Sequence, residues 1–102
     1  MKIIILMLSL ILLVGCTTQT GNTKDKVHGY DVGPVWGHLY LINDHSTVYC
    51  FDKGLYESKI ESAEDLNQTV KVYYNKQYPF NTFLCSAVDG YERVEVIGIE
   101  VV

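Results

Sequence analysis

The side chains able to do chemistry are few in this chain, and they form no recognised catalytic or metal-binding pattern. Asp44, His45 and Ser46 have the types of a hydrolytic triad. A triad is assembled from residues distant in sequence, however, and a polar turn explains three such neighbours better. The other histidines, His28 and His38, lack the close spacing of a zinc site, and phosphate-loop, calcium-loop and nucleophile-elbow motifs are absent. We therefore expect a protein without catalytic activity, metal or cofactor.

The N-terminal segment has the organisation of an export signal. A basic residue is followed by an apolar run and by small residues before Cys16. The run is shorter than the about 20 apolar residues that a membrane-spanning helix needs, and polar residues follow it at once. An ordinary secretory signal or an uncleaved anchor would fit the same pattern, and both would still export the domain.

The end of this segment, Leu13-Val14-Gly15-Cys16, resembles the lipobox of prokaryotic lipoproteins. That resemblance implies that residues 1–15 are a signal peptide, and that the Cys16 thiol is lipidated and anchors the mature chain to a membrane. The next residue is Thr17, not the aspartate that resembles an inner-membrane retention signal. We therefore expect an extracytoplasmic, membrane-anchored lipoprotein, in the outer membrane if the host has one.

The other two cysteines are candidates for a cross-link. If Cys16 carries the lipid, Cys50 and Cys85 remain as a pair in an oxidising compartment. We predict that they form a disulfide. A pair of buried free thiols is the alternative, because the sequence does not show the geometry of the pair.

Charge and length restrict the class of partner and the size of the core. Removing residues 1–15, which include Lys2, leaves seven Lys and Arg against twelve Asp and Glu, a formal charge of -5. Affinity for nucleic acid comes chiefly from Lys and Arg that neutralise phosphates, so this acidic balance argues against a nucleic-acid partner. The remaining chain forms one small domain, which buries about 60% of its unfolded surface and gains from a cross-link.

The mature chain divides into a polar tether and a β-rich domain. Residues 16–32 are mostly polar, small and without period, which predicts a lipidated cysteine followed by a flexible tether. Residues 33–102 alternate short apolar and aromatic runs with turn signals, and no segment keeps a helical period for three turns. We predict that this second part is the folded domain.

The first predicted hairpin joins Val35–Ile42 to Thr47–Asp52 around a polar turn. The predicted register opposes Tyr40 with Tyr49, His38 with Phe51, Leu39 with Cys50, and Leu41 with Val48. One face is then apolar and includes Cys50, while the other face is aromatic. A slip of one residue would exchange the faces.

The second predicted hairpin is centred on Asp89-Gly90, because both central positions of a type I′ turn need positive φ. It joins residues 82–88 to residues 91–97 and pairs Cys85 with Val94 on an apolar face. Both cysteines would then point into the core, which supports the predicted disulfide.

Three further elements are predicted between and after the hairpins. A short strand at Leu55–Ile60 precedes one helical turn at Ser62–Leu66, in which Ser62 is the N-cap and Leu66 enters the core. Thr69–Asn75 is a strand with Val70, Val72 and Tyr74 facing inward. Residues 98–102 extend the last strand.

This order of elements predicts the fold class. Three strands, a helical turn and two or three more strands resemble a small OB-like barrel, in which a helix plugs the barrel end between the third and fourth strands. We expect an all-β domain, a five- to six-stranded OB-like barrel with one short helical turn. The alternative is a small β-sandwich.

An aromatic strand face is the candidate binding surface. Tyr and Trp are rigid and amphipathic, which suits binding surfaces and half-buried sheet positions alike. If a closed barrel turns that face inward, the same side chains are core. The candidate residues are Trp36, His38, Tyr40, Tyr49, Phe51 and Tyr73.

The expected function is a non-catalytic binding or structural module, which the lipid on Cys16 holds at the cell envelope and which recognises an envelope protein or polymer. One alternative is an exclusion or inhibitor lipoprotein that blocks an envelope receptor, which this chain resembles in size and anchor only. Another is a lipid-anchored enzyme or metal-binding protein, for which His38 beside an acid in a cleft would be the sign. The sequence contains no motif for either alternative.

Overall fold

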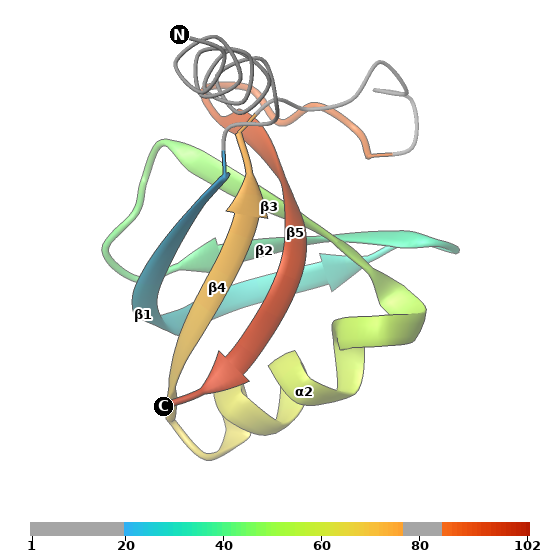
Figure 1. Cartoon of the computed structure of the whole chain (residues 1–102). Coiled ribbons are helices and arrows are strands. Elements are labelled where there is room, and N and C mark those ends of the chain that lie inside the picture. The colour runs from blue at the N-terminus through green and yellow to red at the C-terminus, as the bar shows by residue number, and fades with distance from the viewer. Residues whose placement is uncertain (1–19, 77–84) are drawn as a thin grey trace, which may run out of the picture.

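Short strand-forming runs, each closed by a turn, build a five-stranded barrel with one helix (Figure 1). The structure is a computed structural model that describes residues 20–76 and 85–102. The predicted signal peptide and Cys16 lie outside the described residues, as do residues 82–84 of the second predicted hairpin. The elements are β1 (Thr20–Val32), β2 (Trp36–Leu41), β3 (Thr47–Asp52), α2 (Lys53–Asp65), β4 (Thr69–Asn75) and β5 (Glu92–Val101).

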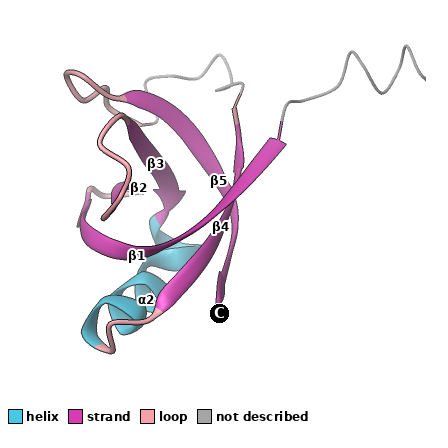
Figure 2. Cartoon of the chain, turned by 90° about the vertical axis from the view of Figure 1, so that its left-hand side faces the viewer, coloured by secondary structure: helices cyan, strands magenta, loops and turns pink. Residues whose placement is uncertain are grey.

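The barrel closes in the order β1-β2-β3-β5-β4. Its strand pairs are antiparallel except for β3 with β5, which run parallel. The helix α2 follows the third strand and lies across one end of the barrel (Figure 2). The predicted all-β, OB-like barrel with one short helix is confirmed, and the chain does not form the alternative sandwich.

The first strand corrects the predicted domain boundary. Residues 20–32, which we predicted to be part of a flexible tether, form β1 and pair with both β4 and β2. The domain therefore begins at or before Thr20 and not at Gly33. Only Val27 of this strand is buried, so backbone hydrogen bonds to two neighbours stabilise a strand that its composition does not reveal.

The helix α2 is longer than the predicted helical turn. The carboxylate of Asp52 caps it by accepting a hydrogen bond from a backbone N–H of the first turn at 3.2 Å. Ile60 and Ala63, three residues apart on one helical face, are fully buried, whereas Leu66 is 65% exposed. The predictions of a strand at 55–60 and of Leu66 in the core are therefore wrong. Across the two described ranges, no helix is long and apolar enough to cross a membrane.

The hairpin of β2 and β3 forms as predicted, but its register differs by one residue. His38 is opposite Cys50, and Leu39 is opposite Tyr49. Tyr49 and Phe51 therefore face the barrel interior with Leu39, whereas Cys50 faces outward with His38. The reason is that β3 is buried on both sides, so its apolar residues do not distinguish its two faces.

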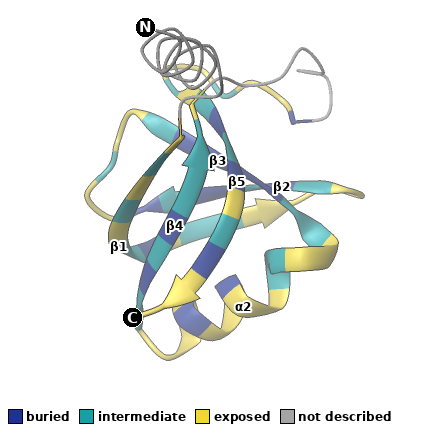
Figure 3. Ribbon diagram, viewed as in Figure 1, coloured by how far each residue is buried: buried dark blue, intermediate teal, exposed yellow. Residues whose placement is uncertain are grey.

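Buried residues line the inside of the barrel and the inner face of α2 (Figure 3). Gly37 allows the closest approach, because a Cβ atom there would overlap the Phe51 ring and lie 2.5 Å from the carbonyl oxygen of Asp31. The prediction that Val70 and Val72 face inward is confirmed, and Tyr74 packs against the same core.

The second predicted hairpin is wrong within the described residues. Residues 86–88 are not a strand, and β5 pairs with β3 and β4 instead. Tyr91 N donates a hydrogen bond to Val88 O at 3.0 Å, and Gly90 has a φ of 84° whereas Asp89 has no positive φ. This is the φ pattern of a type II turn and not of type I′. The Asp-Gly pair predicts a turn correctly but does not determine which strands flank it.

Candidate functional site

The outer face of β2 and β3 is covered by residues 85–91, here called the 85–91 segment. Cys85 is joined to Cys50 of β3 by a disulfide, with the two Cα atoms 6.2 Å apart. Tyr91 packs edge to face on Tyr40 of β2, with ring centroids 5.5 Å apart. The predicted disulfide is confirmed, but it lies on the outside of the barrel and not in its core, as the observed register requires.

His38 connects three parts of the chain at this face. Its Nδ1 atom lies 2.7 Å from Asp31 Oδ1 on β1, and its Nε2 atom lies 2.9 Å from Ser86 O in the 85–91 segment. Both partners are acceptors, so only the imidazolium form of His38, which has two N–H groups, makes both hydrogen bonds. The Asp31 side chain is 60% exposed, so solvent weakens the ion pair and its role is to orient the ring.

A histidine beside a carboxylate at a pocket is the arrangement that would favour an enzyme or a metal site. The side-chain donor atoms of His38, Cys50 and Cys85 lie within 4.8 Å of one another. A cysteine must be a thiolate to bind a metal ion or to act as a nucleophile, however, and the two sulfur atoms here are joined to each other. Both ring nitrogens of His38 also have partners already. In the disulfide form this cluster holds the 85–91 segment in place and does not fit a metal ion.

The structure separates the predicted aromatic face into two sets. Trp36, His38 and Tyr40 lie on the outer side of β2 and are partly exposed. Tyr49 is 3% exposed and Phe51 is fully buried, and both belong to the barrel core. The prediction that these two side chains belong to a binding surface is therefore wrong.

Tyr73 lies apart from that face, on the outer side of β4. Its ring packs over Gly98 of β5, its hydroxyl hydrogen-bonds to the carboxylate of Glu100, and the Lys71 Nζ atom lies 5.1 Å from the ring centroid. These neighbours hold Tyr73 in a cross-strand ladder. It is not continuous with Trp36, His38 and Tyr40 in the structure.

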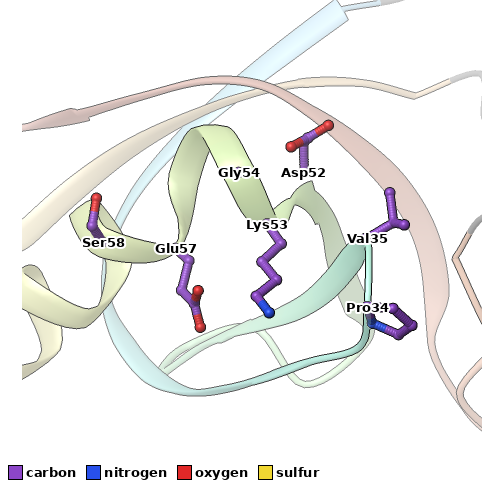
Figure 4. Close-up of a pocket in the computed structure, with 7 residues that line it drawn as sticks. All are labelled: Pro34, Val35, Asp52, Lys53, Gly54, Glu57 and Ser58. Atoms are coloured by element: carbon purple, nitrogen blue, oxygen red, sulfur yellow. The ribbon is translucent and has the colours of Figure 1, made fainter.

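Two open pockets flank the turn between β1 and β2. One has a volume of about 500 Å³, and its lining includes Trp36, His38 and the first two residues of the 85–91 segment. The other, of about 460 Å³, lies between Pro34 and Val35 of the turn and the first residues of α2 (Figure 4). The turn is therefore a ridge between two hollows.

Backbone hydrogen bonds hold this turn in one conformation. Gly33 N donates to Trp36 O at 2.8 Å, and Lys53 N donates to Val35 O at 2.9 Å, which connects the turn to α2. Val35 is nevertheless 57% exposed and Val32 is 39% exposed. An apolar turn with this exposure is the surface feature that the aromatic-strand prediction missed. Its signal in the sequence is a Gly-Pro pair with apolar residues on both sides.

A separate polar cluster orders the turn between β2 and β3. Asp44 accepts hydrogen bonds from the backbone N–H groups of Ser46 and Thr47, both at 3.0 Å, and from the Tyr49 hydroxyl at 2.7 Å. Burial alone would raise the pKa of Asp44, but these hydrogen bonds outweigh burial and lower it. Burial, followed by the bond to Asp44, raises the pKa of Tyr49 far above its usual range. The cluster supports the hairpin and is not a catalytic triad.

This hydrogen bond predicts an acid-dependent loss of stability. A Tyr49→Phe variant keeps the buried ring but loses the hydrogen bond. Near neutral pH its free energy of unfolding should be about 1 kcal/mol lower than that of the wild type. The pKa of Asp44 is lower in the folded state than in the unfolded state. The ionised carboxylate therefore stabilises the fold fully above the unfolded-state pKa of about 3.9, and this stabilisation is lost as the pH falls through the folded-state pKa. Urea titrations at neutral and at strongly acidic pH should therefore show a smaller difference between wild type and variant in acid. Tyr40→Phe is the control, and a pH-independent loss for Tyr49→Phe would contradict the prediction.

Comparison of the chain with protein-family models, with curated proteins and with solved structures found no match. The geometry of the outer face and of the turn between β1 and β2 is therefore the basis for assigning a function.

Proposed function

We propose that this chain is a non-catalytic binding module, which a lipid on Cys16 anchors at the cell envelope. We further propose that it binds an envelope protein or polymer through the turn between β1 and β2. We define the docking surface as Val32, Pro34, Val35 and Trp36. The observation that supports this location is that the turn exposes apolar side chains although two backbone hydrogen bonds hold it rigid.

Rigidity and exposure together favour binding. Ordering a loop on association costs free energy, and a turn that is already held avoids much of that cost. Trp36 is the type of residue that most often anchors an interface, and the two flanking pockets offer hollows for side chains of a partner. In OB-like barrels, the loop between the first two strands borders the surface that commonly binds ligands. That likeness of fold supports the location and not the identity of the ligand.

A second candidate function is thiol chemistry, which the His38, Asp31 and disulfide cluster favours. Reduction would place two thiols beside an imidazole that a carboxylate orients, which is the environment of a reactive cysteine. We rank it second because the disulfide is closed and both ring nitrogens are engaged. A Cys50→Ala/Cys85→Ala variant distinguishes the two, because the docking surface contains neither sulfur and a thiol enzyme needs them.

Photo-cross-linking tests the docking surface. A photoreactive amino acid at Val35, in the full-length protein in membranes of its host, should form a defined adduct that shifts the band on a gel. The same amino acid at Ile97 of β5, which is 49% exposed, is the matched control and should form none. Adding Trp36→Ala should lower the cross-linking yield at Val35 by roughly tenfold or more, because truncating an anchor residue of an interface usually costs about 2 kcal/mol or more of binding free energy. Equal yields at both positions, or a yield that ignores Trp36→Ala, would show that the turn is not the docking surface.

A further inference from the structure

We propose that the end of the barrel at which β1 begins is held by a short spacer against the lipid head groups of the membrane, so that the docking surface projects into the aqueous space. This proposal rests on the lipid anchor of the proposed function. It goes further by assigning a membrane-facing end to the barrel and a direction from which the partner approaches.

The spacer between anchor and barrel is much shorter than the sequence predicts. β1 begins at Thr20, four residues after Cys16. An extended chain gains at most about 3.6 Å per residue, which limits the separation of these two residues to about 14 Å. A tether that reached residue 32 would have allowed about 58 Å. The start of β1 therefore stays close to the bilayer for as long as Cys16 is lipidated.

Three strand ends gather beside Thr20. Thr20 pairs with Asn75, the last residue of β4, and Asn75 pairs with Glu95 near the start of β5. Figure 1 shows the start of β1, the end of β4 and the start of β5 together at the top, with α2 and the C-terminus at the bottom. Figure 2 shows the same separation from the side. The spacer consequently brings the end opposite α2 to the membrane.

The charge of the helix α2 favours the same orientation. This helix, at the far end, carries four acidic residues against two lysines, and an anionic bilayer surface repels that excess. At the end where β1 begins, Lys76 directly follows β4, but Glu92 and Glu95 offset its charge. Lys24 and Lys71 pair with each other four positions from Asn75, toward the α2 end, and do not contribute to this end. The spacer therefore determines the orientation.

The docking surface then lies away from the lipid. It follows the far end of β1, a strand of 13 residues that covers about 40 Å along its curved path. In Figure 1 the turn between β1 and β2 projects from the side of the barrel, well away from the start of β1. The partner accordingly approaches from the aqueous compartment and not from within the bilayer.

Fluorescence quenching tests this orientation in the lipidated, full-length protein. A fluorescent amino acid is placed at Asn22 near the start of β1 or at Ser62 on α2, both of which are exposed. The protein is reconstituted in vesicles of phosphatidylcholine and phosphatidylglycerol that contain a phosphatidylcholine with a nitroxide on its head group. Quenching at Asn22 should be several-fold stronger than at Ser62. Equal quenching at both sites, or stronger quenching at Ser62, would overturn the proposal.

Two variants separate the orientation from the anchor itself. Inserting about a dozen Gly and Ser residues after Thr18, enough to add roughly 20 Å of reach, should lower quenching at Asn22 toward the level at Ser62. Unchanged quenching at Asn22 would show that the short spacer does not hold the barrel. Cys16→Ser should release the protein from the membrane fraction. If that variant stays membrane-bound, the anchor of the proposed function fails, whereas equal quenching in a protein that Cys16 does anchor refutes only the orientation.

Discussion

Replacing Cys50 and Cys85 together by alanine should lower the free energy of unfolding by about 4 kcal/mol, because the disulfide closes a loop across a sequence separation of 35 residues. A small domain has little stability to spare, so this is a large fraction of the total. The observed position of the disulfide adds a local effect. With the cross-link removed, the 85–91 segment keeps its contacts to His38 and to Tyr40 but loses its covalent link to β3.

Urea denaturation followed by circular dichroism measures the loss. Oxidised wild type should unfold at a high urea concentration. Wild type reduced with dithiothreitol and the double variant should both unfold at lower urea concentrations that are similar to each other. Alanine is chosen because Cys50 is fully buried and a serine hydroxyl there would need a partner. If oxidised wild type and the double variant unfold at the same urea concentration, the cross-link does not form in solution. Alkylation of both thiols in unreduced protein, detected by mass spectrometry, would establish the same point independently.

Replacing Phe51 by alanine should cost about 3 to 5 kcal/mol, the usual loss for a fully buried phenylalanine. Its ring fills the space above Gly37 and contacts Tyr30 edge to face, with centroids 6.4 Å apart. The surrounding strands are closed into a barrel and cannot collapse into the cavity, which places the expected loss toward the upper end of the range.

Trp36→Ala is the matched control for Phe51→Ala, because the predicted hairpin placed both side chains on one face and the observed register separates them. Trp36 is partly exposed, so its replacement should cost well under half as much. Circular dichroism is the suitable signal, since Trp36 is the single tryptophan of the chain. Equal losses for the two variants would contradict the observed register and support the predicted one.

Individual elements show where sequence reasoning succeeded. The bounds of β3 and β4 were predicted to the residue, because runs of β-forming residues between turn signals mark both strands. The predicted helix is too short, because the apolar residues on the buried face of α2 are few and Leu66, which we predicted to enter the core, is exposed. Local pattern therefore located β3 and β4, but it missed β1 and predicted a strand where α2 forms.

The candidate site was less accessible to sequence reasoning. The pair of Asp31 and His38 joins a residue assigned to a flexible tether with one assigned to a strand, so no spacing rule connects them. The apolar turn at Val32 and Val35 spans the predicted boundary between tether and domain. The prediction therefore assigned Val32 to the tether and Val35 to the domain. A wrong boundary thus concealed both features, although their residue types were visible.

The sequence by itself determined the class of the fold, the bounds of β3 and β4 and the pair of cysteines available for a disulfide, because residue composition, turn residues and cysteine number are local or additive properties. Only the tertiary structure decided the register of β2 with β3, the inclusion of residues 20–32 in the barrel and the side on which the disulfide lies. Each of these depends on pairing between segments distant in sequence. A one-residue change of register exchanges the faces of a strand at no cost in local propensity, so packing against the rest of the barrel makes the choice.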